Sequence, residues 1–137
     1  YDRPERRYVA DFVGKSNFIE GRLVEASEGR ALIETASGQR LEGRLPSALP
    51  DGAGLALSIR PEQIELTRNQ RAGAEPVSVV NRIFLGEQTE YLVRHATFGD
   101  LMVLVSRQAE AAEGSLAPGE PAFISWSPKA GLVLGQE

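Results

Sequence analysis

The chain has 137 residues, of which 42% are hydrophobic and 25% charged, the composition of a folded globular protein. Its net charge is −4, and its 15 Lys and Arg residues are spread along the chain, so general nucleic-acid binding, which depends on a basic face, is disfavoured. The absence of cysteine excludes disulfides, thiolate metal ligands and cysteine nucleophiles, and no apolar run approaches the ~18 residues of a membrane-spanning helix.

A short helix is predicted over residues 4–13, because Pro4 suits the first helical position and Gly14 is a natural end. The apolar residues that recur there at helical spacing are Tyr8, Val9, Phe12 and Val13. The opening is charged where an export signal would be apolar, and it lacks a starting Met. We therefore expect a piece excised from a longer protein that carries no export signal.

After this helix the apolar period changes to that of strands, separated by turn residues such as Ser37-Gly38 and Pro50-Asp51-Gly52. The strands predicted in the first half are 18–26, 31–35, 40–45, 55–60 and 64–66. Residues 67–76 are polar and show no apolar period, so they predict a connection. The strands predicted in the second half are 77–84, 89–94, 101–106, 122–127 and 132–134.

An internal repeat is visible at an offset of 67 residues. It relates Gly52, Ser58 and Pro61 to Gly119, Ser125 and Pro128. In both places a glycine turn leads into an apolar strand, then Ser, two more residues, Pro and a short final strand. The sequence therefore predicts an all-β chain of two small barrels. The expected divisions are a linker helix over 1–16, a first repeat over 17–66, a connection over 67–76 and a second repeat over 77–137.

Two motifs suggest chemistry that their surroundings do not support. Gly14-Lys15-Ser16 ends like a phosphate-binding loop, but Val9 stands where that loop needs its first glycine, and the predicted order is helix to strand. His95 is the only histidine, and we expect it to be solvated in a hairpin connection. A metal site or catalytic triad would need further ligands or a nucleophile beside it.

Paired carboxylates and one tryptophan complete the candidates. Glu62 with Glu65, and Glu87 with Glu90, could serve as acid and base in a cleft, although on half-exposed hairpins solvated side chains are expected. Trp126 lies in a predicted strand, where an indole usually belongs to a core or an interface. We find no convergent active site, and we expect this chain to have no catalytic residues, bound cofactor or metal.

The segment SIRPEQIEL at 58–66 resembles the S-x-R-P-E-x-x-x-L signature of the transport-associated OB domain, the TOBE domain, of ABC importer ATPases. The opening YDRPERRYVADFVGKSNFIEG is similar to the stretch that joins the ATPase domain to that domain in spermidine/putrescine and ferric-iron type subunits. VVNRIFLGEQTEYLVR at 79–94 and ISWSPKAGLVL at 124–134 resemble the second repeat. Lys129, where Glu is common, and the longer HATFGD turn at 95–100 depart from the pattern.

The resemblance implies two tandem OB-like barrels that form an accessory, regulatory and dimerisation region of a transport ATPase powering solute import, of polyamines, ferric iron or similar. ATP and Mg would bind the missing ATPase domain. The implied partners are a second copy, that ATPase domain and the membrane permease subunits, at the cytoplasmic face of the bacterial plasma membrane. The alternative is an independent OB-like domain that binds a small ligand of the oxyanion type. The candidate interaction residues are Arg60, Glu62, Glu87 and Trp126.

Overall fold

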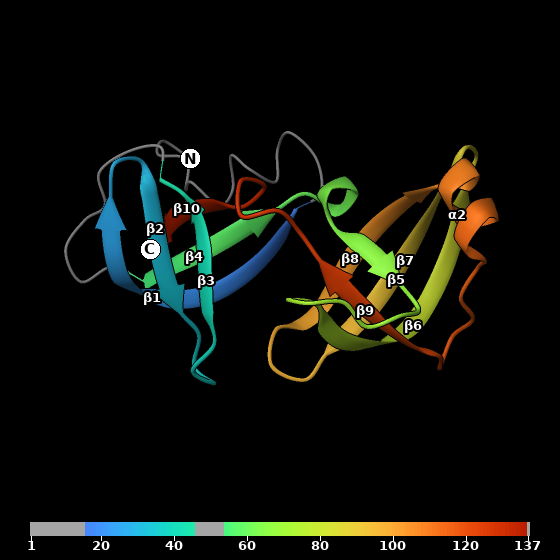
Figure 1. Cartoon of the computed structure of the whole chain (residues 1–137), viewed down its shortest axis with the longest axis horizontal. Helices are drawn as coiled ribbons and strands as arrows, with labels where there is room; N and C mark the ends of the chain where they lie inside the picture. The colour runs from blue at the N-terminus through green and yellow to red at the C-terminus, as the bar shows by residue number, and fades with distance from the viewer. Residues whose placement is uncertain (1–15, 46–53, 137) are drawn as a thin grey trace, which may run out of the picture. The chain divides into compact units, whose positions relative to one another are not determined.

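The computed structural model describes residues 16–45 and 54–136, and strands make up most of them (Figure 1). The helix predicted over 4–13 lies outside the described residues. No described helix is long and apolar enough to cross a membrane. The predicted all-β fold class is confirmed. The strands are β1 Asn17–Ser27, β2 Arg30–Glu34, β3 Arg40–Arg44, β4 Gly54–Ile59, β5 Glu65–Thr67, β6 Glu75–Leu85, β7 Gln88–His95, β8 Gly99–Ser106, β9 Pro121–Ser125 and β10 Leu132–Gln136.

Within the described residues, two short helices accompany these strands: the 3-10 turn η1, Pro61–Gln63, and the helix α2, Arg107–Glu113. The sequence pattern predicted no element at the residues of α2. Ser106 caps it by accepting a hydrogen bond from the Ala109 N–H at 3.0 Å, and Gly114 ends it with φ of 91°. A capping Ser, a run of good helix formers and a closing Gly were the signal that could have identified it.

The strands divide into two compact units. Unit 1 comprises residues 1–60 and 127–137, and its described strands form a closed barrel in the order β1-β2-β3-β10-β4. Unit 2 comprises residues 61–126 and holds a five-stranded sheet in the order β5-β9-β6-β7-β8. Each unit is assembled around its own apolar interior, which includes Ile33 and Leu57 in unit 1 and Val93 and Ile124 in unit 2.

The units are not consecutive in the sequence, which differs from the expected division at 67–76. β5 follows the strands of the first half but pairs with β9, and β10 follows β9 but pairs with β4. Residues 68–74 are therefore a loop inside unit 2 and not a connection between repeats. The physical reason is that strand partners are chosen by long-range packing, whereas the sequence pattern reports only that a strand exists.

The repeat detected in the sequence reappears in the strand register. In unit 1, Ser58 lies opposite Leu132 and Leu57 opposite Val133. In unit 2, Ser125 lies opposite Glu65 and Ile124 opposite Leu66. β9 of unit 2 lies 67 residues after its equivalent in unit 1, β4. β5 of unit 2 lies 67 residues before its equivalent in unit 1, β10. The two units are thus built on one pattern, with their last strands exchanged.

Candidate functional site

The barrel of unit 1 closes at a seam between β3 and β10. Leu132 lies opposite Arg44 there, and the Arg44 N–H donates to the Gly131 carbonyl at 2.9 Å. Glycine makes this approach possible, because a Cβ on Gly43 or Gly131 would lie 2.5 or 2.6 Å from Leu57 Cδ1. The strands can therefore approach closely enough to pair only without side chains at these two positions.

Two arginine side chains reinforce the same seam. Arg44 Nε donates to the Lys129 carbonyl at 3.0 Å, and Arg30 Nη2 donates to the Pro128 carbonyl at 3.4 Å. Both carbonyls belong to the turn that leads into β10. These charge-assisted bonds hold the last strand of unit 1 in place.

Unit 2 carries different residues at the positions equivalent to these two glycines and two arginines. The matching strand registers place Val105 and Ile64 where unit 1 has Gly43 and Gly131. Likewise, Ser106 and Gln88 stand in place of Arg44 and Arg30. Within the described residues β5 and β8 are the two ends of the sheet and no ladder joins them. Branched side chains and the loss of both arginines therefore leave this seam open.

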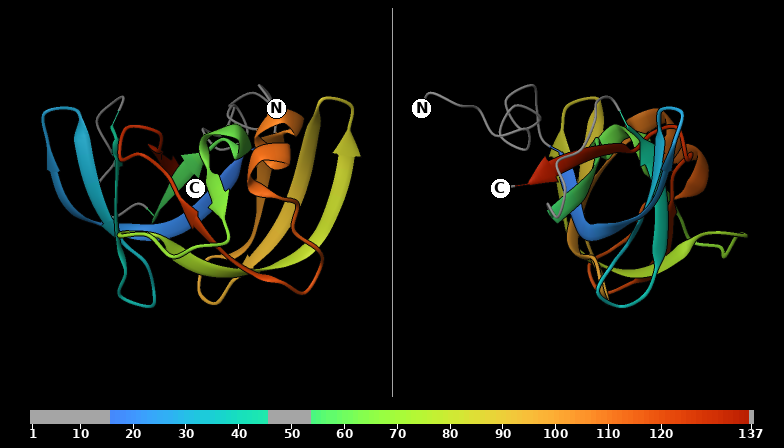
Figure 2. Two further views of the ribbon diagram at one scale, coloured as in Figure 1. Left: turned by 45° about the vertical axis from the view of Figure 1, so that its right-hand side comes forward. Right: turned by 90° about the vertical axis from the view of Figure 1, so that its left-hand side faces the viewer.

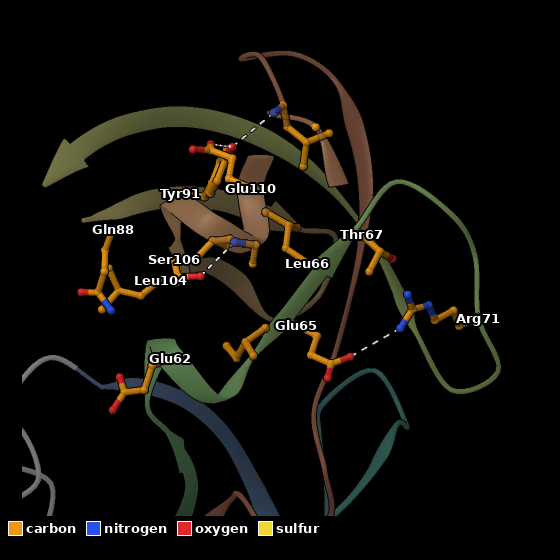
Figure 3. Close-up of a pocket in the computed structure, with 15 residues that line it drawn as sticks. Glu62, Glu65, Leu66, Thr67, Arg71, Gln88, Tyr91, Leu104, Ser106 and Glu110 are labelled. Atoms are coloured by element: carbon orange, nitrogen blue, oxygen red, sulfur yellow. Dashed lines mark hydrogen bonds and ion pairs between the residues drawn. The ribbon is translucent and has the colours of Figure 1, made fainter. Parts of the chain in front are cut away.

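A cavity of about 500 Å³ lies along the open seam of unit 2 (Figure 3). Its apolar wall comes from β5, β8 and the segment after α2, namely Leu66, Leu104, Val105 and Leu116. Its polar groups include Glu62, Glu65, Arg71, Gln88, Ser106 and Glu110. Figure 3 shows Glu65 directed toward Arg71, with 3.5 Å between Glu65 Oε1 and Arg71 Nη1. Three carboxylates against one guanidinium make this cavity unsuited to an oxyanion.

A buried hydrogen-bond network fixes α2 beside the cavity. The Glu110 carboxylate accepts from the Thr89 hydroxyl at 2.8 Å and from the Tyr91 hydroxyl, which itself accepts from the Leu116 N–H at 3.2 Å. Burial raises the pKa of Tyr91, and the hydrogen bond to Glu110 raises that pKa further. Among the described residues no buried side-chain nitrogen or oxygen lacks a partner. The network therefore serves to anchor the helix.

The four residues predicted to form an interaction surface lie at different features of their units. Arg60 is half-buried and follows β4 in unit 1. In unit 2, Glu62 is exposed at the rim of the cavity, and Glu87 is exposed in the turn between β6 and β7. Trp126 is half-buried after β9, with its ring centroid 6.3 Å from that of Phe98. The three residues of unit 2 do not form one site, and their functional role stays a prediction.

His95 is buried, so the expectation that it is solvated was wrong. Its Nδ1 accepts from the backbone N–H groups of Thr97 and Phe98, both at 3.0 Å, so the ring proton is on Nε2. That Nε2 donates to Glu75 Oε1 at 2.8 Å, and the ring stacks on Phe98 with centroids 3.9 Å apart. The extra residues of the 95–100 turn fold back over the histidine. The sequence could not predict this burial, because it depends on the backbone geometry of the turn.

Of the Gly14-Lys15-Ser16 motif, the structure describes only Ser16. Ser16 leads directly into β1, whereas a phosphate-binding loop leads into a helix. Groups of three or more His, Asp or Glu residues that could hold a metal are absent from the described ranges.

Two apolar clusters were missed by the sequence analysis. Every exposed large hydrophobic side chain among the described residues lies in the β1–β2 or the β6–β7 hairpin: Leu23, Val24, Ile83, Phe84 and Leu85. For the β6–β7 cluster the available signal was three consecutive apolar residues before a glycine turn, because a strand cannot direct all three to one face.

The fold and these features define a class: a duplicated OB-like β-barrel domain that offers a cavity and exposed apolar hairpins. A sequence profile of the TOBE domain matches residues 57–134. The chain belongs to the TOBE domain family.

The curated relatives are longer proteins. The chain is 39% identical over 140 residues to the spermidine/putrescine import ATP-binding protein PotA of Rubrobacter xylanophilus, covering 98% of this chain and 36% of that protein. It is 34% identical over 134 residues to PotA 1 of Pseudomonas aeruginosa, covering 98% of this chain and 35% of that protein. The chain therefore spans about a third of the length of these relatives.

Among solved structures, the cytoplasmic molybdate-binding protein ModG, crystallised with molybdate bound, is similar with a TM-score of 0.71 and 17% sequence identity. The likeness covers 98% of this chain and 99% of that one. It confirms the fold and carries no information on ligands.

Proposed function

We propose that this chain is the C-terminal accessory region of the ATP-binding subunit of an ABC importer, where it pairs two subunits and regulates them. The observation that carries the proposal is the match of 98% of this chain to about a third of proteins named as import ATP-binding subunits. ATP and its Mg ion would be held by the ATPase domain of the subunit, and this chain has no catalytic step of its own. A polyamine is the proposed solute, because both relatives are named for spermidine and putrescine.

The proposed location follows from the proposed partners. The ATPase domain of the same subunit, the permease subunits and a second copy would hold the chain at the cytoplasmic face of the plasma membrane. Small barrels have a high ratio of surface to core, so burial against a neighbour is an effective source of stability. A weak dimer of this chain, near the ~1,200 Å² lower end of standard interfaces, is expected because the ATPase domains would contribute their own contacts.

The decisive experiment compares the full-length subunit with one that ends before residue 17. In a reconstituted transporter, the shortened subunit should still hydrolyse ATP, while the coupling of hydrolysis to polyamine uptake or its inhibition should be altered. Mg-ATP titrated calorimetrically into the 137-residue chain should give no binding heat. Micromolar ATP affinity, or identical transport and regulation by both subunits, would contradict the proposal.

The cavity of unit 2 favours a second candidate, a small-ligand domain. Its acidic lining argues against the oxyanion class, so equilibrium dialysis with molybdate should detect no binding. Micromolar molybdate affinity that is lost in Arg71→Ala would instead support that alternative.

A further inference from the structure

The two hairpins that carry exposed apolar side chains occupy equivalent places in the two units. Both have two-residue turns, between Ser27 and Arg30 in unit 1 and between Leu85 and Gln88 in unit 2. We define tip 1 as Leu23 and Val24 on β1, and tip 2 as Ile83, Phe84 and Leu85 on β6. Figure 2 shows β6 and β7 side by side along their length.

The apolar side chains of both tips are 39% to 56% exposed. A bulge between Leu23 and Glu25 interrupts the alternation of β1, and Val24 lies in that bulge. Elsewhere in the described residues, large apolar side chains are buried or half-buried. Exposed apolar residues confined to two places in this way are typical of interaction surfaces.

Tip 2 is positively charged. The Arg82 and Arg107 guanidinium carbons lie 5.0 and 5.4 Å from the centre of the Phe84 ring. Hydrogen bonds to backbone carbonyls orient both side chains. Arg82 Nη1 donates to the Leu116 carbonyl at 2.9 Å, and Arg107 Nη1 donates to the Gly86 carbonyl at 2.8 Å. Neither guanidinium forms an ion pair with a described carboxylate. Of the carboxylates in this hairpin, exposed Glu87 offsets one of the two charges, whereas Glu90, opposite Ile83, is buried and already has a partner.

Tip 1 is negatively charged. Glu25 is exposed next to tip 1, and Glu28 is exposed in the turn of the same hairpin; neither forms an ion pair with any described Arg, Lys or His. The cations of the same hairpin are already engaged, Arg22 with Glu34 at 3.4 Å and Arg30 with Glu42 at 2.7 Å. Tip 1 therefore presents apolar side chains with unmatched carboxylates, whereas tip 2 presents apolar side chains with unmatched guanidiniums.

We propose that tip 1 of one copy docks on tip 2 of a second copy, so that a twofold dimer contains this contact twice. The proposal rests on the dimer of the proposed function and names its surface. Pairing tip 2 with tip 2 would bring four guanidiniums together, and pairing tip 1 with tip 1 would bring four carboxylates together, so both are disfavoured. Phe84 beneath two arginines is the kind of anchor that dominates interface energetics.

The test is sedimentation equilibrium on the 137-residue chain and two variants, from low to several hundred micromolar. L23S/V24S removes tip 1, and F84S removes the centre of tip 2. Each variant alone should dimerise about tenfold more weakly or worse. An equimolar mixture of the two should regain association, because tip 1 of one variant and tip 2 of the other are intact. Q70S, a change at an exposed residue in the loop of unit 2 that does not line the cavity, is the control and should dimerise like the unaltered chain.

A charge exchange provides a second measurement that leaves the apolar residues unchanged. Glu28→Arg and Arg107→Glu should each weaken the dimer, and the chain that carries both should recover. Circular dichroism spectra should match throughout, since both side chains are exposed.

The possible results distinguish an error in the proposed contact surface from an error in the proposed dimerisation. A sharp monomer at several hundred micromolar overturns both the surface and the dimerisation part of the proposed function. A dimer that none of these variants weakens overturns the surface alone. If F84S fails to dimerise while L23S/V24S dimerises normally, tip 2 pairs with itself and the proposed contact is wrong.

Discussion

Units 1 and 2 have nearly the same strand pattern but differ at one seam. In unit 1, Gly43 and Gly131 let β3 and β10 meet, whereas in unit 2 Val105 and Ile64 stand at the matching positions and a cavity lies between β5 and β8. Two glycines and two arginines therefore separate a closed barrel from an open one. A duplicated fold can thus keep a closed barrel in one unit and leave a cavity in the other.

The largest effect is expected when the closed seam is filled. Gly131→Ala should destabilise the chain by about 1–3 kcal/mol, because its methyl group would overlap Leu57, which is fully buried. Urea denaturation measures the change. Gly54→Ala is the matched control, since nothing lies within 4 Å of a Cβ there, and it should change stability by less than about 0.5 kcal/mol. Equal effects would show that the glycines do not close the barrel.

The open seam gives the next prediction. Tyr91→Phe should cost about 1–3 kcal/mol, because it leaves Oε2 of the buried Glu110 carboxylate and the Leu116 N–H each without a partner, while Thr89 still donates to Oε1. The pKa of Tyr91 is raised in the folded state, so its contribution is fully present below the unfolded value of about 10 and is lost as pH rises through the folded value. Stability measured from pH 9 upward should fall more steeply in the unaltered chain than in Tyr91→Phe. Parallel curves would contradict this assignment.

The smallest effects are expected at two exposed ion pairs, one in each unit. Arg30 lies 2.7 Å from Glu42, and Arg94 lies 2.8 Å from Asp100. Each arginine lowers the pKa of its carboxylate, so the stabilisation is present above the unfolded value and is lost as pH falls through the folded one. Asp100→Asn and Glu42→Gln should therefore alter thermal midpoints only slightly at neutral pH, and less again in high salt. Glu42→Gln should have the larger effect, because Arg30 also bonds to Pro128 at the seam.

The sequence predicted where the strands are far better than which strands pair. Turn residues and alternation identified all ten strands, because these signals are local. The pairing of β5 with β9 and of β10 with β4 depends on contacts between distant segments, so the expected boundary at 67–76 was misplaced. Of the functional features, Glu62 at the cavity rim was a sequence candidate, whereas Phe84 was not. Exposure depends on how far a hairpin extends past its neighbours, and alternation does not report that.

The exchange of β5 and β10 divides each sequence repeat between the two units. A chain with only one copy of the repeat would hold four strands that pair with each other and a fifth that pairs elsewhere. Two such chains would complete each other by trading their last strands, as in a domain-swapped homodimer. Gene duplication and fusion would then convert that two-chain assembly into a single polypeptide without altering one strand contact. In its strand pairing, the doubled barrel is therefore equivalent to such a homodimer joined into one chain.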